Sequence, residues 1–360
     1  MPAFKKEQRK AKNPSPHRTR GHAKNHHPVS GADFCRGSFY LFFRFQMPFE
    51  IQDMEGPVQP VADREGVPLA EEDPLVSRRE FLQTTAAMMI SDHAASSDTK
   101  AEAFAAQEEA YRKLLTLRER RASEVYGREA VQEAFRRDTK LFVGCMDERV
   151  SVPAGWKKIG NGGSGVLFDD GQISGMLCSL KQAKAQVREI TWHDGCGAAG
   201  IRCAAIRKAE PGAEPDQTAV AKEGAERLAE GIPGTPVRHV RFADMSGDPH
   251  FHHARAVVVD LDGFFNPSVL PFPAAFELTA KYYPDEEQIM AELKVAIGIA
   301  FGDHGFGEKA FDQEQGGVPI AVVLTEDLSD PAATAKLCDR IGEFLVEHFP
   351  RTATLVPLRR

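Results

Sequence analysis

The stretch that decides the fold lies near the middle of the chain and reads LFVGCMDER, at residues 141–149. It is a short apolar run that ends abruptly at polar residues, a pattern typical of a buried strand. Cys145 therefore stands at the carboxyl end of a strand, which is where open α/β sheets place their ligands. A second stretch, ITWHDGCG at residues 190–197, has the same character and leads through two glycines into a helix. His193 and Cys196 thus also lie at a strand end.

From Thr139 onward, apolar runs of strand length alternate with helical stretches. This alternation is typical of parallel strands joined by crossover helices. The predicted fold class is therefore α/β, with a mostly parallel central sheet flanked by helices. The expected strands are residues 140–145, 189–193, 237–242, 256–261, 295–301 and 318–324. The expected helices are residues 175–188, 198–208 and 332–348, and charged helices are expected between residues 101 and 137.

Two cysteines and one histidine form a candidate metal site. Cys145, His193 and Cys196 offer two thiolates and an imidazole, a donor set that suits Zn²⁺. Three protein ligands leave the fourth tetrahedral position open, which is the arrangement of a catalytic zinc site. The remaining cysteines are interpreted as small buried hydrophobic residues, namely Cys35, Cys178, Cys203 and Cys338.

The spacing of these residues resembles a known family. The pattern CxDxR at residues 145–149, followed by HxxCG at residues 193–197, resembles the paired signature of the β-class carbonic anhydrases. Residues 159–163 are similar to the family's Arg-Asn-Ala-Gly strand end, although Gly160 stands where the family usually has arginine. Residues 257–263 are similar to its late Tyr-Asp-x-x-Thr-Gly strand, with Val259 where tyrosine is frequent. The likeness covers about residues 105–270, and it implies a β-carbonic-anhydrase-like fold.

The resemblance also implies an activity and roles for the site residues. The activity is reversible hydration of CO₂ to bicarbonate by a zinc lyase, with Zn²⁺ held by Cys145, His193 and Cys196. Asp147 either pairs with Arg149 and orients the reacting water, or swings onto the zinc as a fourth ligand and closes the site. Arg149 holds Asp147 off the metal, since its planar guanidinium matches a carboxylate bidentately.

Two further residues are expected to contact the substrate. The Gly197 amide, at the start of a helix, is placed to meet negative charge that develops on the substrate oxygen. Asn161, in the stretch that resembles the family's Arg-Asn-Ala-Gly strand end, is also expected to bind substrate. Two alternatives keep the same ligands: an enzyme of this fold that hydrolyses COS or CS₂, and a non-catalytic zinc-bearing sensor or scaffold.

Two other polar stretches have residues that could form a metal or ligand site. DPHFHH at residues 248–253 could hold a second metal, but histidines in a proline-containing loop are usually solvated, and we expect no site there. GDHG at residues 302–305 resembles a loop at a strand end, but no second motif in the sequence pairs with it to form a site.

Composition limits the partners. The formal net charge is -7, and no apolar run is long enough to span a membrane, so neither nucleic acid nor a membrane span is expected. The resemblance implies a pocket built across a subunit interface. A homodimer or higher homo-oligomer is therefore expected, with the helices before Thr139 suited to embracing the partner.

The chain divides into three predicted segments. Residues 1–100 are expected to form a poorly ordered, largely basic extension, because their composition cannot bury enough apolar surface. Residues 101–275 form the zinc domain, and residues 276–360 form a C-terminal α/β extension packed on it. Met47 or Met54 is an alternative translation start. The expected location is cytoplasmic; the alternative is twin-arginine export, since SRREFL at residues 77–82 resembles that signal.

Overall fold

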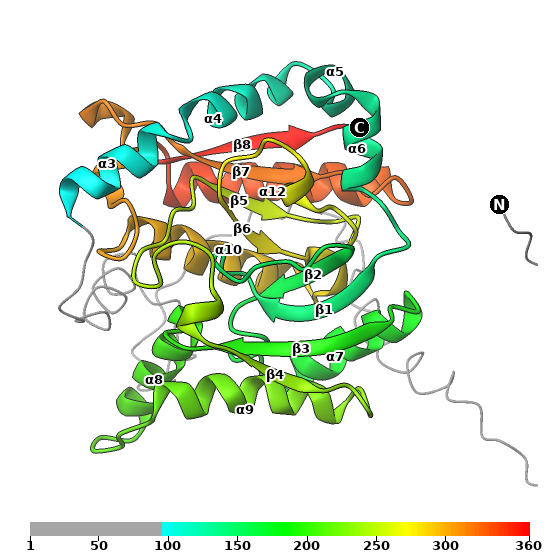
Figure 1. Ribbon diagram of the computed structural model, residues 1–360, viewed down its shortest axis with the longest axis vertical. Helices are drawn as coiled ribbons and strands as arrows, with labels where there is room; N and C mark the ends of the chain where they lie inside the picture. Colours follow the sequence, from blue (N-terminus) through cyan, green and yellow to red (C-terminus); the bar gives the residue numbers. More distant parts are fainter. Residues whose placement is uncertain (1–95) are drawn as a thin grey trace, which may run out of the picture. The chain divides into compact units, whose positions relative to one another are not determined.

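The computed structural model describes residues 96–360. The export-signal resemblance, the alternative start sites, Cys35 and all but the end of the predicted extension lie outside these residues. The described part is an α/β fold with two four-stranded, all-parallel sheets flanked by helices (Figure 1). The predicted α/β class with parallel strands is confirmed. The strands form two sheets, where a single central sheet was expected.

The N-terminal sheet has the order β2-β1-β3-β4, and the C-terminal sheet has the order β6-β5-β7-β8. The strands of the N-terminal sheet are β1 (Lys140–Cys145), β2 (Trp156–Asn161), β3 (Val187–His193) and β4 (Val237–Val240). Those of the C-terminal sheet are β5 (Ala256–Val259), β6 (Ala275–Leu278), β7 (Ile320–Thr325) and β8 (Ala353–Leu358).

The helices fall into three groups along the chain. Within residues 96–360, four precede β1: α3 (Ser97–Ala105), α4 (Glu108–Leu115), α5 (Ala122–Tyr126) and α6 (Arg128–Ala134). Three connect strands of the N-terminal sheet: α7 (Asp170–Gln182), α8 (Gly197–Ala209) and α9 (Gln217–Glu230). Three connect strands of the C-terminal sheet: α10 (Glu286–Phe301), α11 (Glu308–Phe311) and α12 (Pro331–His348). Among residues 96–360, no helix has the length and apolarity needed to cross a membrane.

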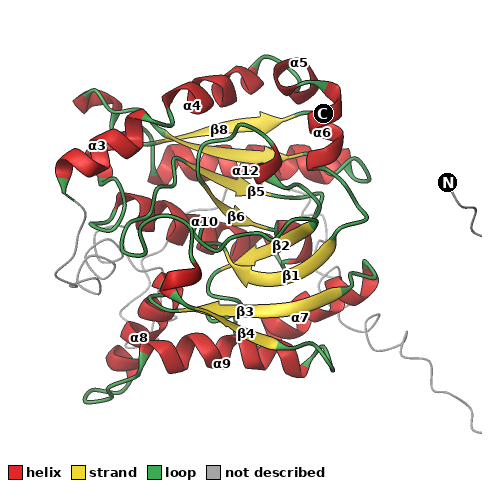
Figure 2. Ribbon diagram, viewed as in Figure 1, coloured by secondary structure: helices red, strands yellow, loops and turns green. Residues whose placement is uncertain are grey.

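The two sheets share one strand order. In each, the second strand along the chain lies at one edge and is followed by the first, third and fourth. The two edge strands β2 and β6 lie next to each other (Figure 2). There the Thr279 amide donates to the Gly160 carbonyl oxygen at 2.8 Å, and the Gly160 amide donates to Thr279 Oγ1 at 2.9 Å. The sheets therefore adjoin through their edges.

The C-terminal sheet is buried on both faces. Val257 and Val259 of β5 belong to a large apolar core that also contains Phe142 of β1. Val258, which points to the opposite face, packs in a second cluster with Tyr111 from the helices before β1. Burial on both faces explains why β5 and β7 are continuous apolar runs rather than alternating ones.

Two predicted elements were wrong. Residues 295–301, expected as a strand, form the last turns of α10. They are buried along their whole length, and a short, fully apolar run does not reveal its periodicity. The helix expected at residues 175–188 ends at Gln182, because Lys184 adopts the left-handed conformation (φ 52°) and β3 starts at Val187.

The helices before β1 are fixed to the C-terminal sheet by a buried cation. The Arg255 guanidinium lies between the rings of Phe104 and Tyr111, 3.7 and 4.3 Å from their centroids. Its Nη1 donates to the Phe104 carbonyl oxygen at 2.9 Å and pairs with Glu108 at 3.0 Å. The first described helix begins at Ser97, within the predicted extension. Helices α3 and α4 thus belong to the packed structure.

Candidate metal centre

Cys145, His193 and Cys196 come together as the sequence predicts. Cys145 ends β1, His193 ends the neighbouring parallel strand β3, and Cys196 is the N-cap of α8. Because parallel strands end at the same edge of a sheet, the three side chains converge. Their ligand atoms all lie within 4.8 Å of one another, and all three residues are buried.

The imidazole of His193 is oriented for ligation. Its Nδ1 lies 2.8 Å from the carbonyl oxygen of Asp194, to which it donates, and this leaves the lone pair on Nε2. Nε2 is buried and has no hydrogen-bond partner among residues 96–360. A buried polar atom without a partner is costly. The nitrogen beside the two thiols therefore fits a metal ligand.

The two thiols differ in acidity. The pKa of Cys145 lies well below its usual value, because the hydrogen bond that the Cys196 thiol donates to it outweighs the opposing effect of burial. The pKa of Cys196 is raised by the same bond and by burial. A metal cation would replace the shared proton and stabilise both thiolates. The donor set and its compactness fit Zn²⁺.

Asp147 and Arg149 form a buried pair beside these ligands. Arg149 Nε donates to Asp147 Oδ1 at 3.0 Å and Nη2 donates to Oδ2 at 2.6 Å, which is the bidentate geometry that the sequence predicts. Burial opposes ionisation of Asp147, but the charges of Arg149 and His252 outweigh it and hold its pKa well below the usual range. Asp147 Oδ2 lies 3.8 Å from His193 Nε2. The carboxylate is therefore ionised next to the ligands.

The loop expected to be solvated in fact supports Arg149. His252 is buried, and its Nε2 lies 3.1 Å from Arg149 Nη2 while its Nδ1 lies 3.2 Å from Glu148 Oε2. Arg149 Nη1 also donates to the carbonyl oxygen of Pro249. Asp147, Glu148 and His252 could themselves group around a metal. Their contacts to Arg149 and to each other already satisfy them, so we assign them to support of the pair.

Sequence reasoning also missed two lysines of β2. Lys158 is buried, donates to the carbonyl oxygen of Asp147 at 2.9 Å and pairs with Glu277 at 3.1 Å. Lys157 lies 3.5 Å from Glu277 and 3.7 Å from Asp260. Carboxylates of the C-terminal sheet thus hold the strand that supports Asp147. Lysine is rarely buried, so the sequence offers no signal for this role.

Gly197 and Asn161, the two residues predicted to contact substrate, lie in different surroundings. Gly197 is the first residue of α8, where an amide has no acceptor within its own helix. Asn161 ends β2 and is fully buried; its Oδ1 accepts from the Gly165 amide at 2.8 Å, and its Nδ2 lies 3.7 Å from Met176 Sδ. The Asn161 side chain therefore holds the turn that follows β2. Glycine is favoured inside that turn, because Gly163 has a φ of 66° and a Cβ on it would lie 3.1 Å from Cys196 Sγ.

Comparison of the chain with protein-family models, curated proteins and solved structures finds no match. The function of this chain must therefore be inferred from the site itself. The site consists of a buried group of two thiols and an unpartnered imidazole nitrogen that could hold a metal ion, with a buried carboxylate-guanidinium pair beside it.

Proposed function

We propose that this chain is a zinc enzyme that reversibly hydrates CO₂ to bicarbonate, as a divergent relative of the β-class carbonic anhydrases. One observation carries the proposal: Asp147 and Arg149 form a buried bidentate pair directly beside the converging Cys145, His193 and Cys196. A purely structural zinc site needs no such pair, and burying one is costly.

Zn²⁺ bound by the three ligands would act as a Lewis acid that lowers the pKa of water from about 15.7 to about 7. Asp147 would accept a hydrogen bond from the reacting water and orient its lone pair toward the carbon of CO₂. Arg149 keeps both carboxylate oxygens of Asp147 engaged, which holds this group away from the metal. The Gly197 amide would donate to the substrate oxygen that gains negative charge.

The position of Asp147 also supports its second predicted role as a fourth ligand. One of its oxygens lies 3.8 Å from His193 Nε2, so the carboxylate lies beside the three candidate ligands and could join them as a fourth. The bonds from Arg149 oppose that change. The balance between these two arrangements would set the fraction of active protein.

The test is a stopped-flow CO₂ hydration assay on zinc-loaded protein, with COS and CS₂ hydrolysis measured on the same sample. We expect hydration of CO₂ that is lost on removal of zinc and restored on its return. Hydrolysis of COS or CS₂ without CO₂ hydration would identify the alternative enzyme. Stoichiometric zinc with none of the three activities would indicate the sensor or scaffold.

A further inference from the structure

The two halves of the described structure repeat one architecture. In each half, four parallel strands follow the same order, with the second strand along the chain at one edge (Figure 2). An α-helix follows the second strand in both, α7 in the first half and α10 in the second. Another helix begins shortly after the third strand, α8 after β3 and α12 after β7. The C-terminal half therefore has the topology of the half that carries the metal centre.

Each half also places a side chain against the strand end of the other half. Arg137, in the loop that leads into β1, has its Nη2 3.0 Å from Oδ1 of Asp262, which follows β5. In the opposite direction, His252 lies in the loop that leads into β5, and its Nδ1 is 3.7 Å from Oδ1 of Asp147, which follows β1. Reciprocal contacts of this kind are typical of the interface between two like subunits.

The C-terminal half supplies groups that the candidate metal centre needs. His252 Nε2 lies 3.1 Å from Nη2 of Arg149, the residue that holds Asp147. Glu277 of β6 pairs at 3.1 Å with Lys158, whose Nζ donates to the carbonyl oxygen of Asp147 at 2.9 Å. Both contacts fix the buried carboxylate beside the ligands. The N-terminal half alone would leave Arg149 and Lys158 without these partners.

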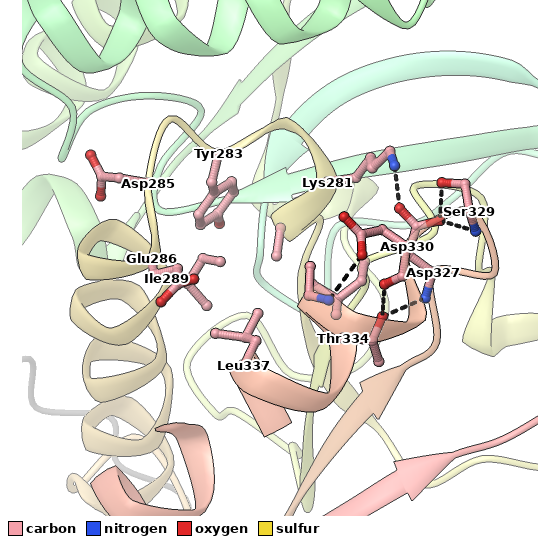
Figure 3. Close-up of a pocket in the computed structure, with 13 residues that line it drawn as sticks. Lys281, Tyr283, Asp285, Glu286, Ile289, Asp327, Ser329, Asp330, Thr334 and Leu337 are labelled. Carbon is pink, nitrogen blue, oxygen red and sulfur yellow. Dashed lines mark hydrogen bonds and ion pairs between the residues drawn. The ribbon is translucent and has the colours of Figure 1, made fainter. Parts of the chain in front are cut away.

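The corresponding place in the C-terminal half holds a pocket without a soft metal-ligand set. The pocket has a volume of about 500 Å³ and lies at the carboxyl ends of β5, β6 and β7 (Figure 3). Its polar groups include Asp285, Asp330 and the Lys281–Asp327 pair, and none of the described residues that line it is a cysteine or a histidine. Two similar halves should therefore hold one metal ion between them.

We propose that the C-terminal half takes the place of a second subunit, so that one chain forms the complete site by itself. In the described structure β6 covers the edge of β2, where the Gly160 amide and carbonyl oxygen both bond to Thr279. A second chain cannot pair with β2 there. The chain thus contains the interface for which the resemblance implies a partner. This proposal concerns assembly and does not depend on CO₂ hydration.

The first test measures assembly in the zinc-free full-length protein. Sedimentation velocity and thermal unfolding are recorded over an about 1,000-fold range of protein concentration. We expect the mass of one chain throughout and an unfolding temperature that does not change, because only an associating protein gains stability with concentration. A dimer whose unfolding temperature rises with concentration would overturn the proposal.

The second test asks whether the C-terminal half acts on the metal centre. Co²⁺ is bound in place of zinc, since its visible absorption depends on its ligands and geometry. We expect one Co²⁺ per chain, and we expect His252→Ala to shift the bands from those of wild type toward those of Arg149→Ala, in which Asp147 is free to bind the metal. His348→Ala, at the end of α12, is the matched control and should leave the spectrum unchanged.

The outcomes separate this proposal from the proposed function. Two Co²⁺ ions per chain, or identical spectra for His252→Ala and wild type, would overturn the proposal. A single chain with the shifted spectrum supports it even if the zinc-loaded protein hydrates no CO₂, a result that would overturn the proposed function alone.

Discussion

Gly160 approaches the backbone of Glu277 so closely that a Cβ atom built on the glycine would lie 1.9 Å from the Glu277 carbonyl oxygen. Strand β6 therefore occupies the space beside β2 that a side chain at position 160 would need. This contact gives a physical reason for the departure from the family resemblance, which has arginine at this place. The C-terminal sheet takes the room of that side chain.

We expect Gly160→Ala to weaken the junction between the sheets. The added methyl group meets backbone, which cannot rotate away, so the free energy of unfolding should fall by about 3 kcal/mol. Denaturant unfolding of the zinc-free protein measures this loss. Gly342→Ala in α12 is the control. A Cβ added there would lie 3.8 Å from its nearest neighbour, an ordinary contact, so this variant should be neutral or slightly stabilising. Equal stability of the two variants would mean that the junction is not closely packed.

Cys145→Ser should abolish stoichiometric zinc binding. A serine hydroxyl stays protonated at neutral pH and is a poor replacement for a thiolate ligand. Metal analysis after extensive dialysis gives the result. The control is Cys203→Ser. Cys203 is a buried cysteine on α8 that is not a predicted ligand, so this variant should retain one zinc per chain. Zinc that survives in Cys145→Ser but is lost from Cys203→Ser would disprove the ligand assignment.

Arg149→Ala should keep zinc and lose activity. Without the guanidinium, Asp147 is free to occupy the fourth position on the metal, and we expect CO₂ hydration to fall at least 100-fold at every pH. Removing one partner of a buried ion pair should also cost about 3 kcal/mol of stability. Zinc content, hydration rate and thermal unfolding are the measurements. Arg136→Ala, which removes an exposed ion pair with Asp138, should leave all three unchanged.

Stability should depend on pH through Glu292. Its pKa rises from 4.5 to about 7 on folding, so the folded state binds more protons between these values. The free energy of unfolding should therefore decrease as pH rises from about 4.5 to about 7, by about 3 kcal/mol from this group. Glu292→Gln should remove that part of the slope. Parallel stability profiles for variant and wild type would mean that Glu292 titrates normally.

Truncation should distinguish the N-terminal extension from the helices that follow it. A protein that starts at residue 96 should unfold at the same temperature as the full chain. A protein that starts at residue 110 lacks Phe104 and Glu108, which leaves the buried Arg255 without its ion-pair partner and one stacking ring. We expect a loss of about 3 kcal/mol or more. Differential scanning calorimetry of both proteins decides the matter.

Local sequence was sufficient to predict that three possible metal ligands converge. Cys145, His193 and Cys196 could be predicted because two short apolar strands end at ligand residues, and parallel strands bring such ends together. The bidentate pairing of Asp147 with Arg149 followed from two residues in one loop. The pairing needed only the spacing within one strand-loop unit, and the convergence needed only the rule that parallel strands end at the same edge of a sheet.

Features that depend on contacts between distant segments could not be predicted. The support of Arg149 by His252 joins residues 103 positions apart, and the bond from Gly162 to Glu292 spans 130. Glu292 lies in a stretch with no motif, and its raised pKa results from burial that only the folded chain provides. Residues 295–301 were mistaken for a strand because complete burial removes the polar face that reveals a helix.

The junction between β2 and β6 has a consequence for synthesis on the ribosome. All three ligand residues precede Gly200, whereas the edge strand that adjoins β2 begins at Ala275. The ligands therefore leave the ribosome before β6 exists. The nascent chain can assemble its metal-binding strands first, but the outer edge of β2 stays open until a partner 119 residues further along has been translated. Closure of the β2 edge is thus a late, long-range event in the synthesis of this protein.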